Sequence, residues 1–403
     1  IHSDRDISRP MRGINLANFL ISKSHKVNFI TTNFNHQKKN HRKKIPKEII
    51  LNENLKINLI NSPGYKKNIG IGRLLDHFFL SLNLTKYLLF YKGPLPDFIF
   101  IGFPPIETSF VLALWALQKK IPFAIDVKDK WPVIFLEVFP RRLRPYFQLP
   151  LLPYTLCTKF IFRKANLICS MSQSYLNWIE KYVYPKKIKN KIAIPLTAPK
   201  VQFNKVDIEL AYKWWENKNV FNNDSPKIIF IGSLSSAFDF LPIIEAAEHF
   251  NKSNSSLQFI IAGSGPMEEN LKLNAIRFDN IIFPGFIEGA KISTLYAMAK
   301  ASLTPYRSTS NFTDNIPNKV IDSLSYGVPL ISSLEGEIKN LIKKNEIGFH
   351  FTNSKNLIIQ INNLINKRNL SEKLSFNSKN TYDKYFNFEK SYERLLQKIL
   401  TFS

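Results

Sequence analysis

Short apolar runs alternate along the chain with longer segments whose apolar residues recur every three or four positions. Continuous apolar runs such as 96–103 are typical of strands buried on both faces of a parallel sheet, and the three-to-four spacing is typical of helices. In the first half the pattern predicts strands at 26–34, 55–60, 96–103, 122–127 and 167–172 and helices at 14–23, 72–89, 107–117 and 172–182. This alternation predicts a doubly wound α/β domain.

A second series of the same kind follows a polar stretch at 198–226. It predicts strands at 227–232, 257–262, 280–286, 301–305 and 328–332, helices at 241–250, 267–277, 290–299 and 317–326, and a helical tail at 355–402. We therefore expect one domain at 1–200, a linker at 201–226 with a short helix at 207–217, a second domain at 227–385, and a C-terminal helix at 386–403. Whether that helix packs back on the first domain stays open. Two such domains place a ligand between them, at the carboxyl ends of both sheets.

Charge separates the two halves. The chain has 56 Lys and Arg against 31 Asp and Glu, a formal net charge of +25. Residues 1–200 hold 33 of these cations and 11 of these acids, so almost the whole excess lies there and indicates an anionic partner. An AT-rich genome would also raise the Lys content. We find no helix-turn-helix, zinc or RNA-binding signature, so nucleic acid is not the expected partner.

Composition excludes two further classes. The two cysteines, Cys157 and Cys169, are too few for a Cys-ligated zinc site, and we predict no metal site. A membrane-spanning helix is not expected, because no uninterrupted apolar run reaches about 18 residues.

Glycines end two strands of the second series. Gly232 is followed by Ser233, and Gly263 and Gly265 precede Pro266 at the start of a helix. Glycines allow the backbone to approach a ligand, and a helix N-terminus offers free N–H groups to a phosphate. A plain tight turn explains the same residues.

The most informative segment is 312–332. Asp314 precedes a predicted helix, Lys319 lies in its first turn, and Asp322 lies deeper in it. A lysine beside free N–H groups suits a diphosphate, and a carboxylate accepts hydrogen bonds from two sugar hydroxyls. The alternative is an N-cap aspartate followed by a solvated helix face.

This segment resembles the E-x7-E region of GT-B glycosyltransferases of family 4. Asp314 and Asp322 stand at the two glutamate positions, each one methylene shorter, residues 317–319 stand at P-x-K, and residues 327–329 stand at G-x-P. Residues 263–266 resemble the G-x-G-P loop of the same family.

The first half shows the resemblance too. Residues 126–132 (D-V-K-D-K-W-P) are similar to the D-x-R-D-x-W-P segment of enzymes that build surface polysaccharides such as lipopolysaccharide and capsule. The resemblance implies two Rossmann-like domains facing across a cleft, the N-terminal one lacking its first strand in this chain. It implies donor contacts from a set of seven residues, namely Gly232, Ser233, Gly263, Gly265, Arg307, Asn318 and Asp322. Lys319 and Asp314 would be catalytic.

Asp129 is the candidate of the first domain. It follows a predicted strand and precedes Trp131 and Pro132. A carboxylate there would accept the proton of an acceptor hydroxyl or stabilise charge on the sugar ring. The alternative is a structural pairing with Lys128, Lys130 or Arg142.

Cations and apolar side chains interleave farther along the first domain. The residues concerned are Arg141, Arg142, Arg144, Tyr146 and Phe147. This mixture suits an anionic membrane surface or the acceptor that lies there. The alternative is a buried helix pair with a solvated basic face.

Together these features predict a glycosyltransferase that moves a hexosyl or N-acetylhexosaminyl group from a UDP-, GDP- or dTDP-linked sugar to a lipid-linked or polysaccharide acceptor. We expect retention of configuration, no metal and no other cofactor, and a cytoplasmic enzyme bound peripherally to the inner face of the membrane. The alternatives are a sugar-nucleotide epimerase of the same architecture and a non-catalytic membrane-associated binding protein.

Overall fold

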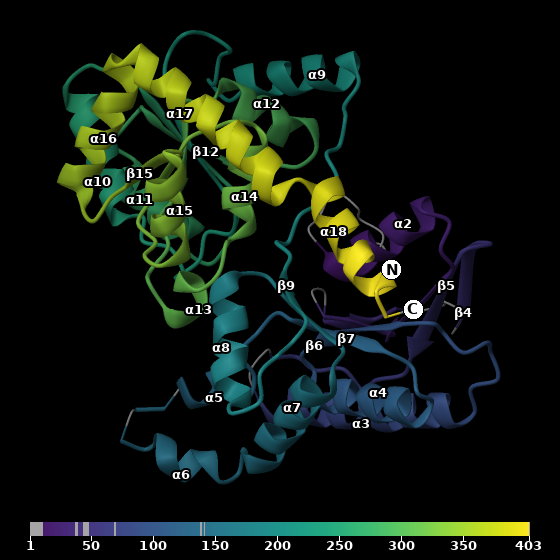
Figure 1. Cartoon of the computed structure of the whole chain (residues 1–403). Helices are drawn as coiled ribbons and strands as arrows, with labels where there is room; N and C mark the ends of the chain where they lie inside the picture. Colours follow the sequence, from purple (N-terminus) through teal and green to yellow (C-terminus); the bar gives the residue numbers. More distant parts are fainter. Residues whose placement is uncertain are drawn as a thin grey trace. The chain divides into compact units, whose positions relative to one another are not determined.

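The computed structural model describes residues 11–36, 39–42, 48–67, 70–137, 139–140 and 142–402 (Figure 1). The chain forms two compact units. Unit 1 contains residues up to 199 together with 388–403, and unit 2 contains residues 200–387.

Unit 1 is built on two sheets. In the four-stranded sheet the strands β6 (Ile99–Phe103), β7 (Phe123–Val127), β8 (Leu167–Ser170) and β9 (Lys191–Ala193) run parallel and in chain order. In the three-stranded sheet β1 (Val27–Thr32) pairs parallel with β5 (Leu55–Ile60), which pairs antiparallel with β4 (Glu48–Asn52). A short hairpin joins β2 (Phe34–Asn35) and β3 (Asn40–His41).

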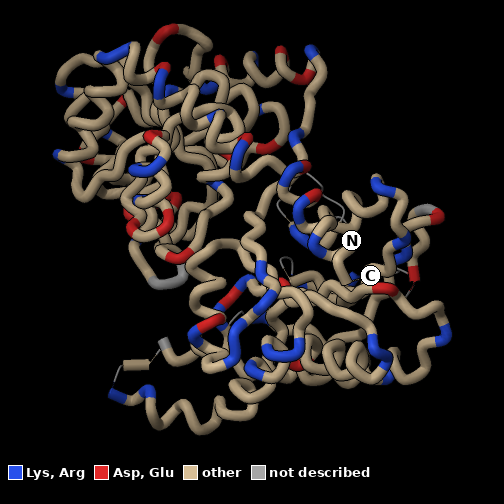
Figure 2. The backbone as a smooth tube through the Cα atoms, in the orientation of Figure 1, with Lys and Arg blue, Asp and Glu red and all other residues tan. Residues whose placement is uncertain are grey.

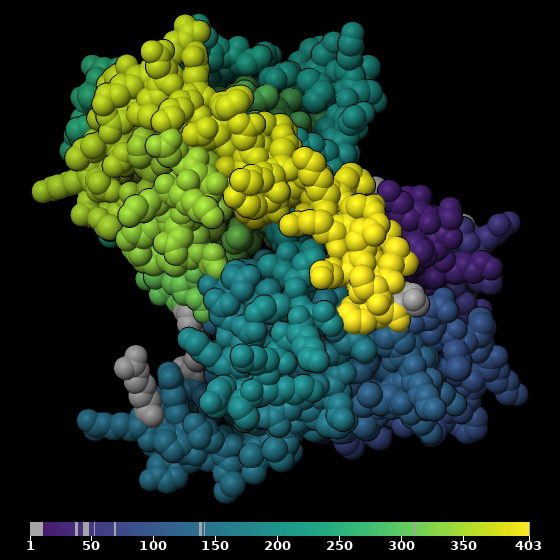
Figure 3. All heavy atoms as spheres, in the orientation of Figure 1, coloured from purple at the N-terminus to yellow at the C-terminus, as the bar shows by residue number. Residues whose placement is uncertain are grey.

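Alternate residues of the four-stranded sheet point into two different cores. One core lies under α4 (Ile106–Gln118), α7 (Leu152–Lys164) and α8 (Gln173–Val183), and receives Phe123 and Ile125. The other lies under α2 (Arg12–Ser22) and α18 (Phe388–Leu400), and receives Ala124. The C-terminal helix α18 is therefore part of unit 1, and it lies against α2 (Figure 3).

Three further helices of unit 1 lie within the described residues. They are α3 (Ile71–Leu89), which packs on α4, and the short helices α5 (Ile134–Glu137) and α6 (Arg144–Gln148). A buried ion pair ties α2 to the sheet, since Arg12 Nε lies 3.0 Å from Asp126 Oδ2 and neither side chain is exposed.

Unit 2 has one six-stranded, all-parallel sheet. Its spatial order is β12-β11-β10-β13-β14-β15, in which the first strand of the unit lies in the middle and the order reverses on either side of it. The strands are β10 (Lys227–Ile231), β11 (Gln258–Ala262), β12 (Ile281–Gly285), β13 (Ala301–Thr304), β14 (Leu330–Ser332) and β15 (Gly348–His350). This is the doubly wound order in which ligands bind at the reversal point.

Helices cover both faces of this sheet. They are α9 (Lys205–Glu216), α10 (Leu241–Lys252), α11 (Glu268–Ala275), α12 (Ala290–Met298), α13 (Ser310–Thr313), α14 (Asn318–Ser325), α15 (Glu337–Asn345), α16 (Ser354–Asn366) and α17 (Arg368–Thr381), followed by a π-helical segment at Tyr382–Phe386. Phe230 and Phe259 face the core under α10 and α16, whereas Ile229 and Ile260 face the core under α9 and α12.

The predicted fold class, α/β with doubly wound parallel sheets, is confirmed. Most predicted elements lie within a few residues of the observed ones. The polar stretch at 201–226, predicted as a linker, contains α9, which packs on α12 through Trp215. The indole N–H of Trp215 donates to the Lys291 carbonyl at 3.1 Å and to Thr294 Oγ1 at 3.0 Å.

Candidate functional site

The reversal point of the unit 2 sheet lies between β10 and β13. Gly232 follows β10, and Pro305, Tyr306 and Arg307 follow β13. At such a point the loops that follow the two neighbouring strands lead to opposite faces of the sheet. A crevice that can hold a ligand then forms at the carboxyl ends of these strands. Residues that carry chemistry are therefore expected at these loops and at helices that point toward them.

The loops after β10 and β11 are bonded backbone to backbone. The Gly232 N–H donates to the Ala262 carbonyl at 2.9 Å, and the Leu234 N–H donates to the Ser264 carbonyl at 2.9 Å. A Cβ at Gly263 would lie 1.8 Å from the Gly232 carbonyl oxygen, and one at Gly265 would lie 2.3 Å from that of Leu234. Loop packing alone therefore requires both glycines, whether or not a ligand approaches them.

Gly232 differs from Gly263 and Gly265 in what a Cβ would meet, because the nearest atoms belong to a side chain and not to the backbone. Helix α14 begins after Pro317, and its second residue, Lys319, extends over Gly232 so closely that a Cβ there would lie 1.7 Å from Lys319 Nζ. The ammonium also lies 5.1 Å from the ring centre of Phe230 and 4.9 Å from that of Phe238. Within the part of the chain that the structure describes, it has no hydrogen-bond or ion-pair partner. Burial lowers the pKa of Lys319 to about 8, although the nearby charge of Asp322 opposes the shift.

Asp322 lies one turn beyond Lys319 on α14. It keeps solvent-accessible surface, yet protein surrounds it closely enough that the loss of hydration raises the pKa of its carboxyl group to about 6. The positive charge of Lys319 opposes this shift. Beside it, Tyr326 stacks on Tyr296 with ring centres 4.7 Å apart. Lys319 and Asp322 thus lie on α14 near the end of β10. They attract each other electrostatically, and no hydrogen bond joins them.

The other predicted donor residues surround this pair to different degrees. Arg307 donates through Nε to the Phe238 carbonyl at 3.4 Å and lies 3.8 Å from Asp239, so its guanidinium adjoins the loop whose Phe238 ring contacts Lys319. Ser233 and Asn318 are exposed, and Asp314 ends α13 half-buried.

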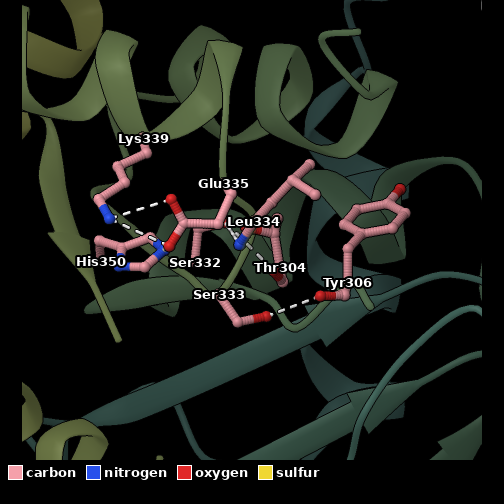
Figure 4. Close-up of polar contacts among 8 residues, drawn as sticks. All are labelled: Thr304, Tyr306, Ser332, Ser333, Leu334, Glu335, Lys339 and His350. Carbon is pink, nitrogen blue, oxygen red and sulfur yellow. Dashed lines mark hydrogen bonds and ion pairs between the residues drawn. The ribbon is translucent and has the colours of Figure 1, made fainter. Parts of the chain in front are cut away.

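Polar contacts that were not predicted fix the neighbouring strand ends (Figure 4). Ser333 Oγ donates to the Tyr306 carbonyl at 2.9 Å. Glu335 accepts from Lys339 at 3.0 Å and lies 3.3 Å from His350 Nε2. A pocket of about 300 Å³ opens beside them, with Asp239, Arg307, Ser333 and Thr352 in its lining. These residues come from separate loops, so only the sheet order brings them together.

In unit 1, Asp129 follows β7 as predicted. Burial raises the pKa of its carboxyl group, and the positive charges of Arg73 and Lys128 oppose that shift. No hydrogen bond or ion pair of Asp129 occurs among the described residues, so the predicted alternative of a structural salt bridge does not account for it. Asp126, three residues earlier, is the aspartate that pairs structurally, with Arg12.

The sequence analysis did not predict a cluster of buried polar side chains near Asp129. His77 Nδ1 of α3 lies 3.8 Å from Glu107 Oε2 of α4, and the Tyr154 hydroxyl of α7 donates to Glu107 Oε1 at 3.1 Å. The His77 ring lies 5.6 Å from that of Trp131. Burial lowers the pKa of His77 to about 4, which leaves it neutral at pH 7, and raises that of Glu107. These residues lie on three helices, and no spacing in the sequence links them.

The predicted basic and aromatic segment is largely exposed. Arg141 lies outside the described residues. Arg142 is exposed, and Arg144 Nε donates to the Phe139 carbonyl at 3.1 Å. Tyr146 is 77% exposed, and Phe147 stacks on Phe139 with ring centres 3.7 Å apart. The short helix α6 has no buried residue, so the alternative of a buried helix pair does not describe it.

No cluster of three or more His, Cys, Asp or Glu that would hold a metal ion occurs among the described residues. The prediction that no metal or cofactor takes part stays a prediction.

Similarity to solved structures defines the class of this fold. Sucrose-phosphate synthase from Thermosynechococcus elongatus superposes with a TM-score of 0.67 at 15% identity, over 97% of this chain and 93% of that one. WaaG, described as a glycosyltransferase involved in lipopolysaccharide biosynthesis, gives 0.58 at 13% identity, over 97% and 95%. HepE from Anabaena, solved in complex with UDP and glucose, gives 0.58 at 14% identity, over 86% of each chain. The fold is the GT-B fold of two Rossmann-like units.

One family model matches part of the chain. Residues 213–381 match the family model described as Glycosyl transferases group 1. This range covers most of unit 2 and includes every residue that was predicted to contact the donor. Among curated proteins, the sequence comparison gives no match.

Proposed function

We propose that this protein is a glycosyltransferase that moves a sugar from a nucleotide-diphosphate sugar to a glycan acceptor. The observation that carries the proposal is the unpaired Lys319 ammonium above Gly232, one helical turn from the Asp322 carboxylate, at the reversal point of the sheet. The match of residues 213–381 to group 1 glycosyltransferases supports it. The structures of HepE with UDP and with UDP-glucose support a nucleotide sugar as the donor.

The donor diphosphate would lie against Lys319 and the first turn of α14. The free N–H groups of that turn and the ammonium both stabilise negative charge, and that charge grows as the bond from the anomeric carbon to the diphosphate oxygen breaks. Asp322 would accept hydrogen bonds from two hydroxyls of the donor, those of the ribose. Arg307 adjoins the same loop and would add a second cation, and Asp314 would hold the transferred sugar.

The acceptor hydroxyl would supply the new bond to the anomeric carbon and lose its proton. We assign that proton, or the stabilisation of charge on the sugar ring, to Asp129. Burial raises its pKa, and a higher pKa makes a carboxylate a better proton acceptor. We propose retention of configuration, no metal requirement, and UDP, GDP or dTDP as the leaving nucleotide.

Two features of the first domain support a proposal for the acceptor class. The likeness of residues 126–132 to surface-polysaccharide enzymes and the excess of cations in residues 1–200 support a lipid-linked or polysaccharide acceptor and a hexosyl or N-acetylhexosaminyl donor. Such an enzyme would work in the cytoplasm at the inner membrane surface.

The first experiment measures nucleotide binding. Thermal unfolding is recorded with UDP, GDP and dTDP for the wild type, for Lys319→Ala, and for Lys339→Ala as the matched control. Lys339 is also a unit 2 lysine but is paired with Glu335. A ligand present at about 100 times its Kd stabilises the folded state by about 2.7 kcal/mol. We expect one nucleotide to raise the unfolding midpoint of the wild type and the control, and a much smaller rise for Lys319→Ala.

The second experiment measures transfer of labelled sugar to a membrane lipid extract. Loss of a charged hydrogen bond of about 1.5–3 kcal/mol should slow transfer by Lys319→Ala roughly 10- to 150-fold. Transfer by Lys319→Ala at the wild-type rate would refute the assigned role. Donor turnover that needs no acceptor would favour the epimerase instead.

A further inference from the structure

The long helix α3 of unit 1 is turned with its apolar stripe toward solvent. The exposed residues recur with helical spacing along one face, and they are Ile71, Leu74, Leu75, Phe78, Phe79, Leu82 and Leu89. Phe78 is 51% exposed, Phe79 45% and Leu82 49%. A helix that covers a soluble core has the opposite polarity, with its apolar stripe buried.

The inward face of α3 is polar in its first half and apolar in its second half, where Leu84 and Leu88 pack in a small core. The polar half explains why the helix keeps this orientation. Asp76 and His77 are buried, and Asp76 accepts hydrogen bonds from the Ser62 hydroxyl and from the Gly64 N–H, the latter at 2.7 Å. His77 lies against Trp131 and near Glu107. Turning the apolar stripe inward would break these contacts, so the exposed stripe is a property of the fold.

The apolar surface continues onto neighbouring helices. Helix α4 packs beside α3, and α7 packs on α4 (Figure 1). Leu114 and Leu117 of α4 are exposed, as are Leu152 and Leu156 of α7. Soluble monomers rarely leave contiguous apolar patches of this kind uncovered.

The charges on these helices have one sign. The described cations on α3, α4, α6 and α7 are Arg73, Lys86, Arg144, Lys159, Arg163 and Lys164. The only two acids on these four helices, Asp76 and Glu107, face inward and are held by hydrogen bonds. Across unit 1 the backbone in Figure 2 shows many more cations than acids.

We propose that the exposed stripe of α3 docks on a bilayer that contains anionic lipids, its leucines and phenylalanines entering the interface. Lys86 lies four residues beyond Leu82 and thus on the same face, where it meets lipid phosphates. A second copy of the chain fits less well, because two such faces would oppose cation to cation. No helix of the described residues is long and apolar enough to cross the membrane, so the helix lies along its surface. The inference does not depend on the proposed sugar transfer.

The test is flotation of the whole chain with vesicles. One set contains phosphatidylcholine alone and the other also contains phosphatidylglycerol. The variant Phe78→Ser/Phe79→Ser/Leu82→Ser removes three apolar groups from the stripe. As the matched control, Leu273→Ser/Ile359→Ser/Phe376→Ser removes three apolar groups of unit 2 that are more exposed still. Thermal unfolding confirms that both variants fold.

We expect binding to anionic vesicles by the wild type and the control, and binding at least about tenfold weaker for the α3 variant. Binding should also fall when phosphatidylglycerol is omitted or salt is raised. Three results would overturn the inference: no binding to anionic vesicles, equal binding by the α3 variant, or an equal loss in the control. Dimerisation of the wild type without lipid, lost in the α3 variant, would assign the stripe to a second copy instead. Nucleotide binding by unit 2 is measured in parallel, and its outcome bears on the proposed function alone.

Discussion

A single methyl group at Gly232 should weaken donor binding by displacing Lys319. The Cβ of Gly232→Ala would lie 1.7 Å from Lys319 Nζ, whereas an ordinary contact is about 3.5–4.0 Å, so the ammonium must retreat by about 2 Å. A charge-assisted hydrogen bond to a phosphate, about 2.8 Å long, does not survive that shift. We expect nucleoside diphosphate binding to weaken by about 1.5–3 kcal/mol, or roughly 10- to 150-fold.

Stability should fall as well, although the group displaced is the end of a flexible side chain. Gly232 has a φ of +156°, which residues with a Cβ rarely adopt, and the backbone strain in Gly232→Ala should cost about 1–3 kcal/mol in the free energy of unfolding. Gly263→Ala is the contrasting variant. Its φ of +144° is strained for alanine in the same way, and its Cβ would also lie 1.8 Å from the Gly232 carbonyl oxygen, which is backbone. We therefore expect a loss in the free energy of unfolding about 1–3 kcal/mol larger than that of Gly232→Ala. Calorimetric titration with the nucleotide and thermal unfolding of both variants measure the two effects separately.

A double-mutant cycle shows whether Gly232→Ala acts through the lysine. If it does, adding Gly232→Ala to Lys319→Met should cause little further loss of affinity, because the ammonium is already absent. Full additivity would mean that the new methyl group meets the ligand directly. Wild-type affinity in Gly232→Ala would refute the placement of Lys319 on the diphosphate.

Three further outcomes follow from the same structure. Nucleoside diphosphate affinity should be highest between about pH 6 and pH 8, because Asp322 protonates below that range and Lys319 loses its charge above it. Titration calorimetry at several pH values measures this affinity, and an affinity that does not change with pH would contradict the prediction. Arg12→Ala removes the buried partner of Asp126 and leaves this carboxylate only the half-exposed Lys128 at 3.5 Å. We expect a cost of about 3–5 kcal/mol, seen as a lower unfolding midpoint, and an unchanged midpoint would show that the Arg12–Asp126 pair is not buried in solution. Leu395→Ala removes a fully buried side chain of α18 from the unit 1 core and should cost about 2–5 kcal/mol in denaturant unfolding, whereas no loss would mean that α18 does not pack on unit 1.

Hydrophobic periodicity predicted the fold well because parallel strands buried on both faces give continuous apolar runs. Strand β11, for example, is observed at 258–262 where 257–262 was predicted. Elements without such a run were missed. Strand β15, Gly348–His350, is only three residues long and half-buried, and α15 carries charged residues over most of its surface.

Periodicity predicted α3 but left the orientation of its apolar face open. It predicts correctly that the helix at 72–89 has an apolar face, but it does not say whether that face meets a core or the solvent. The orientation of the helix depends on the contacts that Asp76 and His77 make on its inward side. Asp76 contacts Gly64, and His77 contacts Trp131 and lies near Glu107. Those partners are far apart in the sequence, so only the tertiary structure places them.

The candidate sites are distinguished by which charged groups lack a partner, and residue type does not show this. Asp126 and Asp129 lie three residues apart in one segment. Asp126 is paired with Arg12 inside the sheet, whereas Asp129, at the strand end, has no hydrogen-bond or ion-pair partner among the residues that the structure describes. Lys319 and Lys339 both lie early in helices of unit 2, yet Lys339 is paired with Glu335. A charged group held near the end of a buried strand without a partner costs folding energy, and bound substrate can supply the missing interaction. Asp129 and Lys319 have no such partner within the described ranges, and substrate binding is therefore the better explanation of why these two charges lie where they do.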